Sequence, residues 1–323
     1  MPKDNPRLAV VMDPIESIHP EKDTTLALLL EAQRRGYALV YLPPGALTAE
    51  SGRVAASGRA LEVRDSATRW FELGEKAGVP LGDFDVVLMR KDPPFDQEYI
   101  YLTYLLELAE RDGALVVNAP QALRDYNEKV SLFRFPQFAP PTLLARELAP
   151  VREFRDREGR IVLKPLDGMG GRGVFVLGPD DPNLAAVFET LGRDGREHIM
   201  VQRHLPEIAD GDKRVLVVDG RPIPYMLARI PTERGGRGNL AAGARGEPRP
   251  LGAREREIAE AVGPELARAG LLLVGLDIIG ESLTEINVTS PTCVRELDRA
   301  YKLNIAGDFF DAVERRLAAR KHN

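Results

Sequence analysis

The stretch Ile161–Leu177, which reads IVLKPLDGMGGRGVFVL, decides how the rest of the sequence is interpreted. An apolar run from Ile161 to Leu163 leads into Lys164, and a second apolar run extends from Val174 to Leu177. Between the two runs lie four glycines, at positions 168, 170, 171 and 173. A strand, a glycine-rich loop and a second strand are typical of a β-hairpin.

The glycines make this hairpin a candidate phosphate-binding flap. Glycine accepts positive φ angles, so its backbone N–H groups can turn toward an anion and approach it closely. Lys164 adds a positive charge at the end of the first strand. We therefore expect a flap over the phosphates of a nucleotide, with Gly168, Gly170 and Gly171 near the ligand.

Other interpretations of the glycine loop are weaker. Residues 168–173 match the dinucleotide fingerprint G-x-G-x-x-G, but that motif must open a helix, and here β-branched and aromatic residues follow. The sequence contains no G-x-x-x-x-G-K-[ST] loop of the Walker A type. A flexible surface hairpin without a ligand is the structural alternative, and the charged partners found further along the chain argue against it.

Composition restricts the class of protein. The 323 residues carry a net charge of −5 without a basic block, which makes nucleic acid an unexpected partner. No apolar run approaches the roughly 20 residues of a membrane helix, and the N-terminus lacks a signal-peptide pattern. The single cysteine, Cys293, excludes an intrachain disulfide. We expect a cytoplasmic protein of two or three domains.

The N-terminal part predicts a doubly wound sheet. Strand patterns at 8–12 and 38–42 flank a helix pattern at 24–35. A third strand at 84–89 ends at Arg90 and Lys91, and ligands bind beyond the carboxyl ends of such strands. Both residues are therefore candidate substrate contacts, the alternative being a solvated loop stiffened by prolines. The weaker pattern at 45–80 suggests a small hairpin at 54–63 and a helix at 68–77.

The C-terminal half alternates strands with helices. We expect a helix from Asn127 to about Phe135, strands at 199–202, 213–218 and 225–230, and a helix at 254–269. Residues 231–249 are rich in Gly, Arg and Pro and lack apolar periodicity. A long loop of this kind inside a domain is usually functional or disordered, and we expect a lid.

A metal site is predicted where two late strands meet. Glu285 and Asn287 lie two residues apart on a strand and share a face. A three-residue turn at 280–282 would pair Asp277 with Glu285 on that face, whereas a two-residue turn would point Asp277 away. We expect the three-residue turn, because such turns with glycine are common. The resulting oxygen ligands suit Mg²⁺, with a solvated charged face as the alternative.

With these residues assembled, the chain resembles the ATP-grasp superfamily and, within it, the prokaryotic-type glutathione synthetases. The resemblance covers almost the whole chain. It rests on the stretches MDPIESIHPEKDTTLALLLEAQRRGY, VLMRKDPPFD, LKPLDGMGG, DGDKRVLVVDG, RGNLAAGARGEPRP and VGLDIIGESLTEINVTSPTC. It implies a fold of mixed α/β and α+β class, in which a Rossmann-like domain (1–122) precedes a small lobe (123–204) and a large lobe (205–323) of an ATP-grasp module.

The resemblance also implies residue roles. Lys129 and Lys164 would contact the ATP phosphates, Asp212 the ribose, and Asp277, Glu285 and Asn287 would hold two Mg²⁺ ions, with Mn²⁺ possible. The adenine would lie near Gln202, Arg203, His204 and Leu205. Catalytic Arg214 and Arg229 would face the reacting carboxylate. Substrate contacts would come from Arg90, Lys91, Ser290, Thr292 and, in a lid at 230–245, Arg237 and Asn239.

The implied reaction joins γ-glutamylcysteine to glycine in a homotetrameric, ATP-dependent carboxylate–amine ligase. ATP would convert the cysteinyl carboxylate into an acyl phosphate, which the amine of glycine attacks. Two alternatives stay open at this point. One is another ligase of the superfamily, of the D-alanine–D-alanine or glutamate-adding type, and the other is an ATP-binding module without catalysis.

Overall fold

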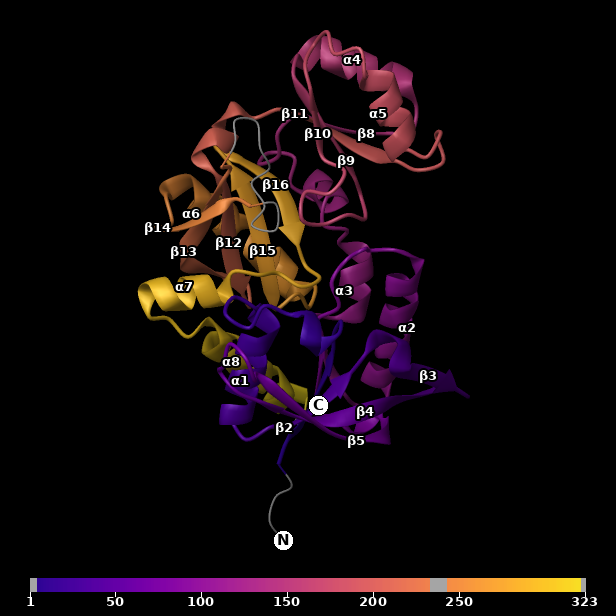
Figure 1. Cartoon of the computed structure of the whole chain (residues 1–323), viewed down its shortest axis with the longest axis vertical. Helices are drawn as coiled ribbons and strands as arrows, with labels where there is room; N and C mark the ends of the chain where they lie inside the picture. The colour runs from indigo at the N-terminus through magenta and orange to yellow at the C-terminus, as the bar shows by residue number, and fades with distance from the viewer. Residues whose placement is uncertain (1–4, 233–242, 321–323) are drawn as a thin grey trace.

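A computed structural model of the chain describes residues 5–232 and 243–320. Within these residues the strands form three separate sheets, which contain seven, four and five strands and follow one another along the chain. Figure 1 shows the three units around a common centre, with the N-terminal unit at the bottom and the other two above it. No helix in the described ranges is long and apolar enough to cross a membrane.

The N-terminal sheet has a parallel centre, as the sequence predicts. Strands β2, β1, β6 and β7 lie side by side and parallel, and β4 extends the sheet antiparallel to β2. The strands span Arg7–Val11 (β1), Ala38–Leu42 (β2), Leu47–Glu50 (β3), Arg53–Val63 (β4), Phe71–Pro80 (β5), Val86–Met89 (β6) and Leu115–Val117 (β7). The helices are α1 (Thr24–Arg34), α2 (Gln97–Arg111) and α3 (Pro120–Asp125).

Two sequence predictions in this unit are wrong. The region 54–63 is one long strand, β4, rather than a small hairpin, and residues 71–80 form β5 instead of part of a helix. Strand β5 pairs antiparallel with β4 along most of its length. The weak local pattern was overridden because the exposed edge of β4 satisfies the backbone hydrogen bonds of β5.

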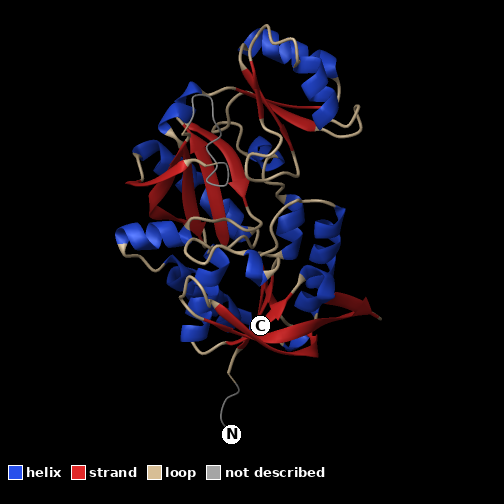
Figure 2. Ribbon diagram, viewed as in Figure 1, coloured by secondary structure: helices blue, strands red, loops and turns tan. Residues whose placement is uncertain are grey.

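The small lobe carries the glycine hairpin. Its sheet has the order β10-β9-β11-β8, and helices α4 and α5 cover one face, as Figure 2 shows. The elements are β8 (Thr142–Ala145), α4 (Leu148–Glu158), β9 (Ile161–Pro165), β10 (Phe175–Leu177), α5 (Leu184–Leu191) and β11 (Ile199–Arg203). The predicted hairpin is confirmed, since β9 and β10 are antiparallel partners on either side of the glycines.

The large lobe is built on an antiparallel sheet of order β14-β13-β12-β15-β16. Its elements are β12 (Asp212–Val218), β13 (Arg221–Ile230), β14 (Arg245–Pro250), α6 (Ala253–Arg268), β15 (Leu273–Ile279) and β16 (Ser282–Asn287), followed by α7 (Val294–Tyr301) and α8 (Ile305–Arg320). The loop predicted at 231–249 is therefore shorter than expected, because β14 pairs with β13. Helix α8 packs back against α1 of the N-terminal unit.

The helix predicted in the segment that joins the first unit to the lobes is also shorter than expected. A helix was expected from Asn127 to about Phe135, but only Val130–Arg134 is helical, as a 3-10 turn. The Asn127 side chain accepts hydrogen bonds from the backbone N–H groups of Lys129 and Val130. These bonds satisfy two N–H groups at the start of the turn, which would have no partner within a helix either, so they are compatible with a short helical turn.

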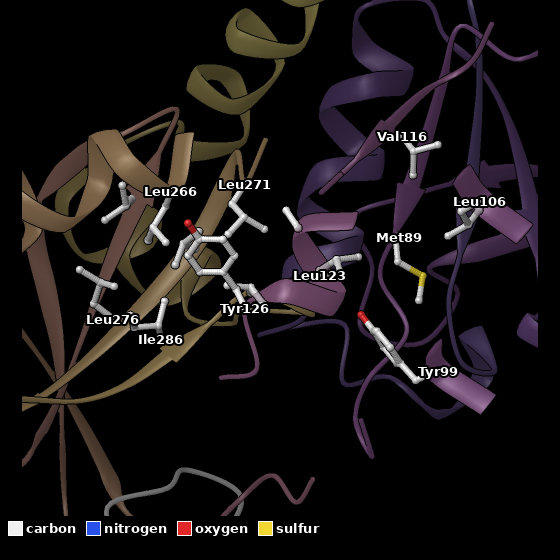
Figure 3. Close-up of a cluster of buried hydrophobic side chains, with 14 of the residues drawn as sticks. Met89, Tyr99, Leu106, Val116, Leu123, Tyr126, Leu266, Leu271, Leu276 and Ile286 are labelled. Carbon is white, nitrogen blue, oxygen red and sulfur yellow. The ribbon is translucent and has the colours of Figure 1, made fainter. Parts of the chain in front are cut away.

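A continuous apolar core connects the N-terminal unit with the large lobe. Figure 3 shows Tyr126, directly after α3, beside Leu271 and Ile286 of the large lobe, and Leu123 of α3 between this group and Met89. All five side chains are buried. Burial of this kind stabilises the contact by about 25 cal/mol per Å² of apolar surface, so the two units form one packed body.

Candidate active site

A cavity of about 690 Å³ lies where the three units meet, and it collects most of the predicted site residues. The cavity is lined by Lys129, Lys164, Gly168, Gly170, Gly171, Gln202, Arg203, His204, Leu205, Asp212, Arg214, Arg229, Asp277, Glu285, Asn287, Ser290 and Thr292. These residues come from distant parts of the chain. Their convergence in a concave site with buried charges is the arrangement expected of an active site.

The large lobe contributes a buried network of two arginines and two aspartates. Arg214 forms a two-point contact with Asp277, at 2.6 Å from Nε to Oδ1 and 3.1 Å from Nη2 to Oδ2. Arg229 Nη2 lies 2.9 Å from Asp277 Oδ2 and 2.6 Å from Asp212 Oδ2. Strand register explains the pairs, because Arg214 lies opposite Asp277 and Asp212 lies opposite Arg229 in neighbouring strands.

Burial and pairing act in opposite directions on the two aspartates. For Asp277 burial alone would raise the pKa, but Arg214 and Arg229 outweigh it and hold the pKa below its usual value. For Asp212 burial raises the pKa to about 6, and Arg229 offsets this only in part. One Asp212 oxygen, Oδ1, is buried without a hydrogen-bond partner in the described structure. A polar ligand in the cavity would satisfy that oxygen.

Two lysines face the cavity, and within the described residues only one of them is paired with a carboxylate. Lys129 Nζ lies 2.9 Å from Glu285 Oε1 and donates to the carbonyl of Gly168 at 2.8 Å. Lys164 Nζ donates to the carbonyl of Thr284 at 3.3 Å, and no carboxylate of the described chain lies within 4 Å of it. Burial lowers the pKa of Lys164. A buried cation without a carboxylate is a ready site for a phosphate.

The pairing of Asp277 with Glu285 is confirmed, but the turn that produces it differs from the prediction. Ile279 pairs with Ser282, so the turn has two residues, and the register shifts between Asp277 and Ile278. This β-bulge, with Thr284 as the extra residue, restores the pairing that a two-residue turn alone would lose. It also turns the Thr284 carbonyl toward Lys164.

The predicted metal ligands all line the cavity. Asp277, Glu285 and Asn287 offer two carboxylates and an amide, the hard oxygen donors that Mg²⁺ and related ions prefer. No group of three His, Cys, Asp or Glu residues in the described ranges is arranged to hold a metal without help. A magnesium site in a phosphate-transferring enzyme needs only one or two carboxylates, because phosphates and water complete it. The donor set therefore fits a divalent ion that arrives with a nucleotide.

Arg90 and Lys91 do not line the cavity among the residues described. Arg90 is buried and donates from Nη2 to the carbonyl of Pro291 at 3.1 Å, and Lys91 lies 3.1 Å from Asp13. Their contacts with substrate stay a prediction. Arg237 and Asn239 lie outside the described residues, as does most of the predicted lid.

Sequence reasoning missed several residues of the cavity. Glu128, Met169, Phe175 and Thr284 line it as well. Met169 and Phe175 are 43 % and 40 % exposed, which is unusual for large apolar side chains. The available signal was their place in the flap, Met169 between two glycines and Phe175 in the strand run after them. Glu128 had only its position beside Lys129, and a single carboxylate at a predicted helix start carries no distinctive pattern.

Solved structures share the fold of this chain. The chain is similar to a D-cycloserine synthetase, with a TM-score of 0.69 and 17 % identity over 96 % of this chain and 99 % of that one. It is also similar to D-alanyl-alanine synthetase A from Vibrio cholerae, with a TM-score of 0.63 and 14 % identity over 98 % and 99 % of the two chains. At such identities the likeness shows the fold alone.

The family follows from sequence. The model of the prokaryotic glutathione synthetase N-terminal domain matches residues 7–124, and that of the ATP-grasp domain matches residues 128–302. Glutathione synthetase of Pseudomonas syringae pv. tomato is 55 % identical over 98 % of this chain and 99 % of its own length. That of Xanthomonas axonopodis pv. citri is 56 % identical over 95 % and 97 %. The chain belongs to the prokaryotic glutathione synthetase family, a family of ATP-dependent carboxylate–amine ligases.

Proposed function

We propose that this protein joins γ-L-glutamyl-L-cysteine to glycine at the expense of ATP, giving glutathione, ADP and phosphate. The observation that carries the proposal is identity of about 55 % over nearly the full length to glutathione synthetases. The cavity supports it, because it places buried cations from two lobes around one space. A carboxylate is a poor electrophile, and this arrangement suits its activation by phosphoryl transfer.

The first step transfers the γ-phosphoryl group of ATP to the cysteinyl carboxylate. An oxygen of that carboxylate bonds to phosphorus while the bond to the leaving ADP breaks, and an acyl phosphate forms. Lys129 and Lys164 would hold the phosphates, and the backbone N–H groups of the glycine flap would cover them. Negative charge develops on the transferring group, and fixed cations in a site shielded from water stabilise it strongly.

In the second step the amine of glycine attacks the carbonyl carbon of the acyl phosphate. The C–N bond forms, inorganic phosphate leaves, and the amine loses a proton. Arg214 and Arg229 would face the reacting carboxylate and stabilise the oxyanion of the tetrahedral intermediate. Their rigid pairing with Asp277 and Asp212 supports this role, because preorganised donors cost little reorganisation during the reaction.

The remaining roles are carried over by resemblance. Glu285, Asn287 and Asp277 would hold divalent ions, Mg²⁺ or Mn²⁺, and such ions neutralise phosphate charge when bound. Residues 202–205 would contact the adenine, Asp212 the ribose, and Ser290, Thr292, Arg90 and Lys91 the carboxylates of the peptide and glycine. Arg237 and Asn239 would reach the site from the lid.

The cellular setting is part of the same proposal. Small molecules would be the partners, with neither nucleic acid nor membrane involved, and the enzyme would act in the cytoplasm as a homotetramer. The net charge of −5 without a basic block supports the exclusion of nucleic acid, and the homotetramer rests on the resemblance alone.

The experiment measures ADP release from purified protein with Mg-ATP and γ-glutamylcysteine, with and without glycine. D-alanine and glutamate serve as control acceptors. Glycine-dependent release, with glutathione identified by mass, is the expected result. Release with another acceptor would keep the ligase class and change the substrate. Absence of release with every acceptor, despite ATP binding, would favour a non-catalytic ATP-binding module.

A further inference from the structure

Glu128 is a buried carboxylate to which the proposed mechanism assigns no role. It lines the cavity, precedes Lys129 in sequence and is only 7 % exposed. Burial raises its pKa, and the charge of Glu285 adds to the effect. Taking a carboxylate out of water is costly unless hydrogen bonds satisfy it, so its partners indicate what it does.

The partners of Glu128 lie in the turn that follows β16, 160 residues away. Its Oε1 accepts hydrogen bonds from the backbone N–H groups of Val288 at 3.0 Å and Thr289 at 3.1 Å, and from the Thr289 hydroxyl at 2.8 Å. The backbone carbonyl of Glu128 accepts from the N–H group of Ile286 at 2.8 Å. One residue thus contacts both sides of Asn287, a predicted metal ligand.

The same turn is held from its other side by Asn118. Its Nδ2 donates to the carbonyl of Val288 at 2.8 Å and to that of Leu273 at 2.9 Å, while its Oδ1 accepts from the N–H group of Leu272 at 2.8 Å. Asn118 therefore anchors the turn to β15, and the Nδ2 of Asn287 itself donates to the carbonyl of Gly275 in β15 at 3.2 Å. Glu128 adds the contacts that hold the backbone on both sides of Asn287.

We propose that Glu128 is a positioning residue, which through Oε1 fixes the turn at 288–289 and so the orientation of Asn287 toward a metal-bound nucleotide. The inference rests on the proposed function, since it assigns a support for the metal site of that reaction. Residues that orient metal ligands typically change metal affinity or activity by 10- to 100-fold when removed. The role needs an acceptor oxygen in place and does not need the negative charge.

Two substitutions separate these requirements. In Glu128→Gln the amide oxygen can accept the same three hydrogen bonds, whereas Glu128→Ala leaves three buried donors without an acceptor. Glu255→Ala is a matched control, because Glu255 is also a buried carboxylate, 5 % exposed and paired with Lys213 at 2.5 Å, but lies in the large lobe outside the cavity lining. All three variants change a buried glutamate, but only Glu128→Ala removes the acceptor oxygen for Val288 and Thr289, the residues that follow Asn287.

The experiment is calorimetric titration of each variant with ADP, in the presence of Mg²⁺ and in EDTA. We expect Glu128→Ala to weaken binding of Mg-ADP by about 10- to 100-fold and binding of metal-free ADP by less than about threefold. Glu128→Gln and Glu255→Ala should stay within about threefold of the wild type in both titrations. Equal weakening with and without Mg²⁺, or equal behaviour of the Ala and Gln variants, would overturn the proposal.

A second variant covers the case in which Glu128→Ala does not fold. Thr289→Val removes one of the three donors to Oε1 and leaves Glu128 unchanged. It should weaken Mg-ADP binding about threefold or more while sparing metal-free ADP, and an unchanged Mg-ADP affinity would count against the proposal. ADP binding can be measured whether or not the protein catalyses ligation. If the wild type binds Mg-ADP in the titration but releases no ADP from ATP in the ligation assay with glycine, the proposed function is refuted and the role of Glu128 is not.

Discussion

The two halves of the cavity are built in opposite ways. In the large lobe, the side chains of Arg214, Arg229 and Asp277 are at most 6 % exposed and contact one another within hydrogen-bonding distance. In the small lobe, the flap consists of glycines at positive φ and of exposed apolar side chains such as Met169. The first half is a buried charge network on neighbouring strands, and the second is a glycine-rich backbone surface.

This difference suggests a division of labour. Preorganised charges act most on a transition state, because they are already oriented when its charge develops. A glycine loop acts most on binding, because the absence of side chains lets its backbone N–H groups approach the phosphates of the bound nucleotide closely. Substitutions in the large lobe should therefore lower kcat, and substitutions in the flap should raise the KM for ATP.

The largest effect is expected in the charge network. Arg229→Ala should lower kcat about 10²- to 10³-fold, because it removes a fixed cation and leaves Asp212 and Asp277 with less compensation. Arg214→Ala should have a similar effect. Steady-state kinetics with saturating ATP, γ-glutamylcysteine and glycine would measure the loss.

A control for this prediction is Arg249→Ala in the same lobe. Arg249 pairs with Asp210 and Glu247 near the surface and lies outside the cavity lining. Surface pairs contribute only about 0–1 kcal/mol, so turnover should stay close to the wild type. Near-normal turnover in both Arg214→Ala and Arg229→Ala would show that the assignment of these arginines is wrong.

A smaller effect, on binding, is expected in the flap. Gly170 lines the cavity at a φ of 64°, where a side chain costs about 1–2 kcal/mol. Gly170→Ala should raise the KM for ATP about 5- to 30-fold, with kcat much less affected. Gly178→Ala is the matched control, since Gly178 follows β10, has no atom within 4 Å of an added Cβ and is outside the positive-φ region. A loss in kcat without a change in KM would contradict the division of labour.

The smallest effect on activity is expected where buried charge serves stability alone. Glu31 in α1 accepts hydrogen bonds from Arg34 and Arg35, and these lower its pKa to about 2. A lowered pKa adds stability that is present above the unfolded value near 4.5 and is lost as the pH falls through 2. Glu31→Gln should therefore reduce the free energy of unfolding by about 1–3 kcal/mol at pH 7, and by less at pH 3.

Urea unfolding of the wild type and the Glu31→Gln variant at pH 7 and pH 3 would test this. Turnover at pH 7 should be unchanged, because Glu31 is not in the cavity lining. A difference in stability that is as large at pH 3 as at pH 7 would mean that the charge of Glu31 is not the cause.

Much of the fold could be predicted because its signals are local. The parallel opening of the N-terminal sheet, the glycine hairpin and the strands of the large lobe follow from apolar periodicity and from glycines that only certain turns accommodate. Strand β5 could not be predicted, because its pattern is weak and its hydrogen bonds go to β4. Pairing of this kind depends on a partner strand that the local sequence does not specify.

The sequence by itself determined which residue types this protein has for its chemistry: lysines, arginines and carboxylates on or beside recognisable strands. It also predicted that Asp277 lies opposite Glu285, but only the tertiary structure decided how that pairing is produced and which other charges meet. The bulge at Thr284 places Asp277 opposite Glu285, and the buried network joins Asp277 to Arg214 and Arg229. Glu128 holds a turn 160 residues away. Such contacts arise because folding brings distant segments into a space shielded from water, where buried charges must find partners.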